Sequence, residues 1–122
     1  MTRYSRQISL PEIGEGGQEK LHKARVLIVG AGGLGSPAAL YLAGAGVGTI
    51  GLADDDMVGI SNLQRQILYT ENEVGQLKVH CAAQRLRALH GNIEVHAYPI
   101  RLNRENARRL IADYDIVVDC CD

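Results

Sequence analysis

The chain has 122 residues and contains no tryptophan, no phenylalanine and only three cysteines. Without these aromatic side chains, a hydrophobic core must be built from valine, leucine, isoleucine and alanine, which suits a parallel sheet covered by helices. Cys81, Cys120 and Cys121 form no C-x-x-C pair, so the sequence shows no zinc site. Adjacent cysteines such as Cys120 and Cys121 rarely reach good disulfide geometry. We interpret all three as buried thiols that pack as small hydrophobic groups.

Long apolar runs and a strong net charge are also missing. The apolar stretches contain a few residues each, far below the ~20 that span a bilayer, and the N-terminus lacks the apolar core of a signal peptide. The formal net charge is −1, which argues against a broad surface for nucleic acid or for a membrane. We therefore expect a cytoplasmic protein that has no membrane partner and no broad nucleic-acid surface.

The sequence instead alternates strand and helix patterns. Short apolar or alternating runs predict four strands, at Arg25–Val29, Thr49–Ala53, Ile93–Ala97 and Asp115–Asp119. Helical spacing and turn residues predict three helices between them, from Ser36 to Ala45, from Val74 or Gly75 to His90, and from Asn103 to Asp113. This order is typical of an α/β, doubly wound, Rossmann-like fold, in which a mostly parallel sheet has the strand order 3-2-1-4.

Two regions are expected on either side of residue 24. Residues 1–24 should form an N-terminal helical arm, with a helix over Pro11–Ala24, and residues 25–122 should form the Rossmann-like domain. A doubly wound sheet normally continues beyond the fourth strand. We therefore expect the chain to be a fragment that is truncated on its C-terminal side, with its last strand at an exposed edge.

A glycine-rich loop joins the first strand to the first helix. It reads Gly30-Ala31-Gly32-Gly33-Leu34-Gly35, a G-x-G-x-x-G pattern. Gly30 allows a tight turn, Gly32 allows a phosphate to approach the backbone, and Gly35 allows the helix to lie against the strand. The strand–turn–helix context favours a nucleotide site, anchored at the helix N-terminus, over a simple tight turn.

An acidic triplet follows the second strand. Asp54 comes 19 residues after Gly35, near the ~20-residue interval that places a carboxylate at the ribose hydroxyls; the alternative is a solvated acid at a strand end. We interpret Asp55 as solvated. Asp56 binds a metal, braces the following loop or is a surface acid, and we favour the brace.

The polar stretch Ser61–Gln66 distinguishes a triphosphate site from a dinucleotide site. Its hydroxyl, amide and guanidinium groups suit the charge that develops on a leaving pyrophosphate, and Arg65 is able to bridge two phosphate oxygens. The alternative for Arg65 is a surface salt bridge. Lys78 opens the next helix, where the helix dipole disfavours a cation unless an anion lies nearby; otherwise it is simply solvated.

Charged residues at the two ends of the chain are further candidates. Asp119 and Asp122 flank the end of the fourth strand, and carboxylates there suit Mg²⁺; Asp122 is the better candidate. Arg6 is either part of a flexible basic terminus or an arginine finger that a second subunit supplies. We interpret all four histidines as surface or packing residues, and four arginines as the solvated side of the last helix, namely Arg101, Arg104, Arg108 and Arg109.

Six segments together resemble the ThiF/MoeB/HesA family, the bacterial relatives of ubiquitin-activating enzymes. They are R-Y-S-R-Q at 3–7, V-G-A-G-G-L-G at 29–35, D-x-D at 54–56, S-N-L-Q-R-Q at 61–66, V-G-x-x-K at 74–78 and D-C-x-D at 119–122. The set covers nearly the whole chain and is far more specific than the glycine loop alone. One departure is Cys121, which stands where many members have threonine.

The resemblance implies an adenylyltransferase that binds ATP and Mg²⁺. Such an enzyme adenylates the C-terminal glycine carboxylate of a ubiquitin-like sulfur-carrier protein of the ThiS or MoaD type, which ends in Gly-Gly, and releases pyrophosphate in thiamine or molybdopterin-type sulfur transfer. The resemblance also implies a homodimer. The family's zinc site and any later cysteine would lie in the C-terminal half, so we expect residues 1–122 alone to be inactive.

The resemblance further implies a role for each matching residue. Gly33 would contact the phosphates, Asp54 the ribose, and Asn62 and Arg65 the nucleotide and its phosphates. Ser61, Leu63 and Gln64 would line the site, Lys78 would steady the phosphates, Asp122 would hold Mg²⁺, and Arg6 would enter the site of the partner subunit. Three alternatives remain open: a different acceptor such as a tRNA base or a peptide, a non-catalytic scaffold, and an NAD-dependent oxidoreductase domain.

Overall fold

The apolar runs of the sequence pair into one sheet in the computed structural model, which describes residues 2–121. Its strands are β1 (Arg25–Val29), β2 (Thr49–Ala53), β3 (Glu94–Tyr98) and β4 (Ile116–Asp119). All neighbouring strands are parallel, and their order is β3-β2-β1-β4. The predicted doubly wound topology and strand order are therefore confirmed.

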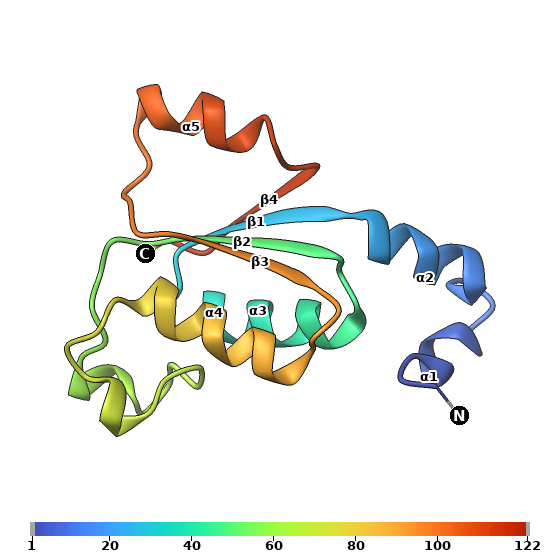
Figure 1. Cartoon of the computed structure of the whole chain (residues 1–122), viewed down its shortest axis with the longest axis horizontal. Coiled ribbons are helices and arrows are strands. Elements are labelled where there is room, and N and C mark those ends of the chain that lie inside the picture. The colour runs from blue at the N-terminus through green and yellow to red at the C-terminus, as the bar shows by residue number, and fades with distance from the viewer. Residues whose placement is uncertain (1, 122) are drawn as a thin grey trace.

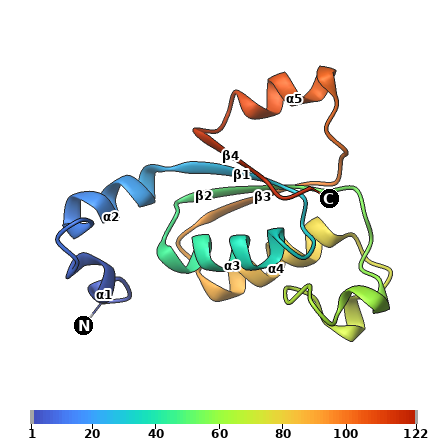
Figure 2. The ribbon, with the colours of Figure 1, turned by 180° about the vertical axis from the view of Figure 1, so that it is seen from behind.

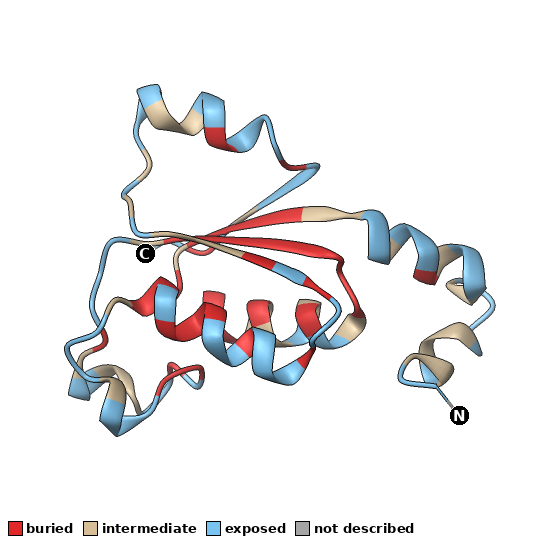
Figure 3. Ribbon diagram, viewed as in Figure 1, coloured by how far each residue is buried: buried red, intermediate tan, exposed pale blue. Residues whose placement is uncertain are grey.

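Helices cover both faces of the sheet, but unequally. α3 (Gly35–Ala45) and α4 (Lys78–Leu89) lie on one face, and α5 (Arg104–Ile111) lies on the other (Figures 1 and 2). Ala39 and Ala43 are fully buried, so α3 packs closely on the strands. Buried residues concentrate in the sheet and in the inner sides of α3 and α4, whereas α5 is mostly exposed (Figure 3). Within residues 2–121, no helix has the length and apolar character that crossing a bilayer requires.

Local sequence signals explain several helix ends. The Asn103 side chain accepts hydrogen bonds from the backbone N–H groups of Glu105 and Asn106, which makes it the predicted N-cap of α5. Gly46 has a φ of 91°, and this left-handed residue ends α3. Both signals were readable in the sequence because capping side chains and left-handed glycines act over a few residues.

Other boundaries differ from the prediction. The helix that we expected from Val74 or Gly75 begins only at Lys78, because Gly75 has a φ of 88° and Leu77 is extended and bridges to Met57. The helix expected over Pro11–Ala24 is shorter, α2 (Gly14–Lys23), and an unpredicted short helix, α1 (Ser5–Ile8), precedes it. The long loop after β2 contains two 3₁₀ turns, at Ile60–Asn62 and Glu71–Glu73.

Polar contacts attach α1 and α2 to the amino-terminal end of the sheet. The amide groups of Gln7 and Gln18 both donate to the carbonyl oxygen of Ala45, each at 3.0 Å. The Tyr4 hydroxyl contacts Nε2 of the buried His90, whose Nδ1 accepts the backbone N–H of Asn92. Burial lowers the pKa of His90, and the Arg3 guanidinium lowers it further. His90 is therefore a packing residue, and its imidazole is neutral when it contacts the Tyr4 hydroxyl.

The glycine loop provides a direct stability test on α3. A Cβ on Gly35 would overlap the carbonyl oxygen of Gly30, whereas a Cβ on Gly44 would meet nothing within 4 Å. We expect Gly35→Ala to lower the free energy of unfolding by about 1–3 kcal/mol, because backbone must move. Gly44→Ala should raise it by up to ~1 kcal/mol through helix propensity. Urea unfolding of both variants measures this difference, and equal effects would contradict the packing described.

Candidate functional site

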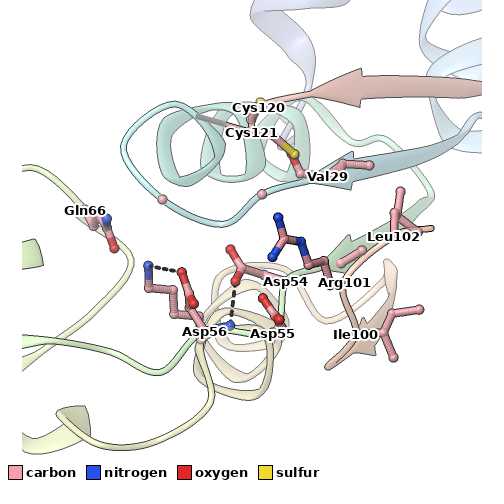
Figure 4. Close-up of a pocket in the computed structure, with 14 residues that line it drawn as sticks. Val29, Asp54, Asp55, Asp56, Gln66, Ile100, Arg101, Leu102, Cys120 and Cys121 are labelled. Carbon is pink, nitrogen blue, oxygen red and sulfur yellow. Dashed lines mark hydrogen bonds and ion pairs between the residues drawn. The ribbon is translucent and has the colours of Figure 1, made fainter.

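A pocket opens at the carboxyl edge of the sheet. The connection from β1 to β2 runs through α3 on one face of the sheet, whereas the connection from β3 to β4 runs through α5 on the other face. Such a switch point is where open α/β sheets bind ligands. Residues at or after the carboxyl ends of all four strands meet there with the start of α4 (Figure 4): Val29, Gly30, Gly32, Ala53, Asp54, Asp55, Asp56, Gln66, Lys78, Ile100, Arg101, Leu102, Cys120 and Cys121. Segments that are far apart in the sequence therefore form one concave site.

The glycine loop forms one wall of this pocket. Gly30 has a φ of 96°, and a Cβ at this position would lie 2.7 Å from the carbonyl oxygen of Cys120. A Cβ on Gly32 would lie 3.3 Å from Nε2 of Gln66. The loop runs directly into α3, so its backbone faces the pocket beside a helix N-terminus, an arrangement that favours an anion.

Asp54 connects the end of β2 to the glycine loop. Its Oδ2 accepts the backbone N–H of Ala31 at 2.8 Å, and its Oδ1 accepts the backbone N–H of Asp56 at 2.8 Å. The buried Tyr69 hydroxyl donates to the Ala31 carbonyl oxygen at 2.6 Å. Burial raises the pKa of Tyr69, and the Asp54 charge raises it further, so this hydroxyl keeps its proton. Asp54 thus shapes the loop and also presents a carboxylate to the pocket.

Lys78 places a buried cation in the lining of the pocket. The residue is 5% exposed, and its Nζ lies 3.9 Å from Oδ2 of Asp56. The Lys78 backbone N–H donates to the Asp56 carbonyl oxygen at 3.0 Å. Asp56 therefore contacts both the backbone and the ammonium of Lys78, in the manner of the loop brace that we favoured. The first turn of α4 carries a cation that points into an acidic pocket rather than into open solvent.

The polar stretch after β2 divides into bracing and site-facing residues. Asn62 accepts the backbone N–H of Gly59 at 2.9 Å and so stabilises its own 3₁₀ turn. Arg65 donates to the Ser61 carbonyl oxygen at 3.3 Å, and its Nε lies 3.6 Å from where a Cβ on Gly33 would be. Arg65 therefore borders the glycine loop. Ser61 and Gln64 are exposed and Leu63 is half-buried, and none of these three lines the pocket.

Gln66 lines the pocket, although the sequence predicted no individual role for it. It is 4% exposed, and its Oε1 has no hydrogen-bond partner among the described residues. A buried amide oxygen without a donor is costly, at about 1–3 kcal/mol. The available signal was its place in the polar stretch Ser61–Gln66, directly after Arg65, although the resemblance implies no role for Gln66 itself. A ligand donor in this pocket would satisfy the oxygen.

Carboxylates gather on the same side of the pocket. Asp54, Asp55 and Asp56 bring oxygen atoms within 4.8 Å of one another. Hard oxygen ligands are what Mg²⁺ prefers, so this donor set fits that ion. Asp119 is exposed, and the Cys121 backbone N–H that donates to it lowers its pKa. Asp122, the predicted magnesium ligand, lies outside the described residues.

Two predictions near the pocket are wrong. We expected Arg101 on the solvated side of the last helix, but it precedes α5 and lines the pocket together with Ile100 and Leu102. The available signal was that these residues directly follow β3, as Asp54 follows β2. We also expected three buried thiols, whereas only Cys81 and Cys120 are buried and Cys121 is exposed at the pocket.

Arg6 lies far from this pocket within its own chain. It is an exposed residue of α1, which sits beyond the amino-terminal end of β1, whereas the pocket lies at the carboxyl end (Figure 1). The role of Arg6 in a partner's site remains a prediction. If it acts on a nucleotide at all, a second subunit must bring it there.

Comparison with known proteins gives one family and several relatives. The model of the ThiF family matches residues 4–122. A sulfur carrier protein adenylyltransferase from Thermus thermophilus is 50% identical over 122 residues, covering 100% of this chain and 45% of the relative. The adenylyltransferase and sulfurtransferase MOCS3 of Anopheles gambiae is 55% identical over 122 residues, covering 100% of this chain and 28% of the relative. The chain thus spans less than half the length of these relatives.

A solved structure supports the same relationship. The tRNA N6-threonylcarbamoyladenosine dehydratase TcdA of E. coli, in complex with ATP, superposes with a TM-score of 0.90 at 32% identity. The superposition covers 98% of this chain and 49% of that chain. The similarity therefore includes both the fold and the sequence.

Asp54 gives a test of how the pocket is built. We expect Asp54→Ala to lower the free energy of unfolding by about 1–3 kcal/mol, because two backbone N–H groups lose their acceptor. Asp55→Ala, at an exposed neighbour for which no hydrogen bond is found within residues 2–121, should change it by less than ~0.5 kcal/mol. Urea unfolding compares the two variants. Similar losses in both would mean that Asp54 does not hold the loop.

Proposed function

The chain belongs to the ThiF family, and from this membership we propose that it supplies the nucleotide-binding part of an ATP-dependent adenylyltransferase. The observation that carries the proposal is the pocket itself. It combines a glycine loop at a helix N-terminus, a carboxylate at the end of β2 and the buried cation Lys78, with Arg65 beside Gly33. The ATP complex of the similar TcdA structure supports ATP as the nucleotide.

The proposed reaction needs no general base. The carboxylate of the acceptor is already an anion, and one of its oxygens attacks the α-phosphorus of ATP. A new P–O bond forms as the bond to the leaving pyrophosphate breaks, which gives an acyl-adenylate. Mg²⁺ would be held by Asp122, as the resemblance implies, and would neutralise charge on the phosphates. The carboxylates of Asp54, Asp55 and Asp56 are the ligands that the described pocket lining offers it.

This chain's own part in the reaction is positioning and charge stabilisation. Amides of the glycine loop face the phosphates, and Asp54 holds the ribose. Lys78 and Arg65 stabilise the negative charge that grows on pyrophosphate as it leaves. Lys78 is already desolvated and held by Asp56, so little reorganisation is required of it when the charge develops.

We further propose that the acceptor is a ubiquitin-like sulfur carrier of the ThiS or MoaD type, with a C-terminal Gly-Gly. The names of the Thermus and Anopheles relatives, which are 50% and 55% identical, support this choice. A tRNA-base acceptor is the second candidate, because the similar TcdA is a tRNA-modifying enzyme. Its lower identity of 32% makes it the weaker choice.

ATP–pyrophosphate exchange by the full-length protein tests the reaction, with candidate carriers that end in Gly-Gly. We expect Arg65→Ala and Lys78→Ala each to remove ~2–4 kcal/mol of transition-state stabilisation, as loss of a preorganised donor does. Arg104→Ala removes an exposed arginine outside the pocket and should leave exchange unchanged. Full exchange in both site variants, or tight NAD⁺ binding with no response to ATP, would contradict the proposal.

Subunit mixing tests whether Arg6 acts across a dimer. An Arg6→Ala subunit and a Lys78→Ala subunit should each be inactive in exchange as homodimers. A mixed dimer would contain one site with an intact Lys78 and an intact Arg6 from the neighbour. We therefore expect mixing to restore about half of the wild-type activity per mixed dimer. If light scattering shows that dimers form but mixing restores no exchange activity, the role of Arg6 across the dimer is excluded.

A further inference from the structure

We propose that Arg101 binds the nucleobase, with its guanidinium stacked on the purine ring of the nucleotide. This inference rests on the proposed function, since it assumes that an adenine nucleotide occupies the pocket. The resemblance implies no role for Arg101, and the sequence pattern predicted only a solvated arginine. Three features of the structure support the assignment: its place, its freedom from other partners and the absence of any aromatic residue in the pocket.

The backbone of Arg101 is fixed at the rim of the pocket. The Ile100 backbone N–H donates to the Tyr98 carbonyl oxygen at 2.8 Å, and the same oxygen accepts the backbone N–H of Asp54 at 3.2 Å. The Asn106 side chain, part of the capping box of α5, donates to the Arg101 carbonyl oxygen at 3.0 Å. Two elements therefore hold this short segment opposite Asp54.

The Arg101 side chain is directed into the pocket. Figure 4 shows its guanidinium turned toward Asp54 and the glycine loop. Within residues 2–121 it forms no ion pair with any carboxylate. The side chain is exposed and lines the pocket, so its guanidinium is accessible to a ligand that enters there.

The order of residues along the pocket identifies which part of the nucleotide Arg101 would meet. Gln66 lies at one end of the pocket, Asp54 in the middle, and Ile100 and Leu102 at the other end (Figure 4). A ribose bound at Asp54 with its phosphates at the glycine loop and Lys78 would direct its base away from them. The base would then lie against the segment Ile100–Leu102.

Chemistry favours stacking at this end. The pocket lining contains no aromatic side chain among the described residues, and the chain has no tryptophan or phenylalanine. A guanidinium is planar and weakly hydrated, so it stacks on aromatic rings as an ammonium does not. The half-buried Ile100 and Leu102 add apolar surface beside it. Arg101 thus supplies the flat surface that an aromatic residue provides in many nucleotide sites.

Calorimetric titration of the full-length protein with ATP, AMP, adenosine and inorganic pyrophosphate tests the assignment. Arg101→Ala should weaken binding of the three adenine compounds by a similar factor, about 3- to 30-fold, which is the range for a stacked cation. Pyrophosphate binding should not change. Arg101→Lys keeps the charge but loses the plane, so it should recover little of the affinity. Arg104→Ala, which removes a neighbouring exposed arginine outside the pocket, should match wild type.

Other outcomes are equally informative. A loss that grows from adenosine to AMP to ATP, with weaker pyrophosphate binding, would make Arg101 a phosphate ligand and overturn the stacking assignment. The stacking assignment would also be overturned if Arg101→Ala bound the adenine compounds as tightly as the wild-type protein does. If the wild-type protein bound none of the adenine compounds, the proposed function would fail, and the role of Arg101 with it.

Discussion

The site depends on the close backbone approach between the glycine loop and the end of β4. A Cβ on Gly30 would lie 2.7 Å from the Cys120 carbonyl oxygen. A Cβ on Gly35 would overlap the carbonyl oxygen of Gly30. These contacts bring the turn after β1 and the start of α3 to the strand beside them. A side chain at Gly30 would separate the loop from the residue after β4, and one at Gly35 would separate the start of α3 from the loop. Either change would disturb the wall on which an anion would rest.

Asp54 transmits this constraint to the rest of the pocket. Its two carboxylate oxygens accept backbone N–H groups from Ala31 in the loop and from Asp56 in the crossover. Asp56 in turn contacts the backbone and the ammonium of Lys78. The loop, the end of β2 and the start of α4 are thus connected through one carboxylate and its neighbour. The ordering of Lys78 is consequently part of the same network as the shape of the glycine loop.

The sequence was sufficient where the determining interactions are local. Apolar runs predicted the four strands, and Asn103 and Gly46 marked helix ends through short-range hydrogen bonding and a positive φ. It was insufficient where distant segments meet. The pocket-facing position of Arg101 depends on where β3 ends relative to β2, and the late start of α4 depends on the bridge from Leu77 to Met57. Both relations join segments that are separate in the sequence.

The charges of the side chains that line the pocket are not enough to stabilise a triphosphate. The described lining contains three carboxylates, Asp54, Asp55 and Asp56, and two cationic side chains, Lys78 and Arg101. Arg65 borders the loop without lining the pocket. If Arg101 binds the base, Lys78 alone faces the phosphates from within the lining, and Asp56 already contacts it. Stabilisation of a highly charged leaving group in such an acidic pocket requires cations from outside the lining. One electrostatic requirement therefore underlies three of the proposed roles. Arg65, a divalent ion and Arg6 from a second subunit would each supply positive charge that the lining lacks.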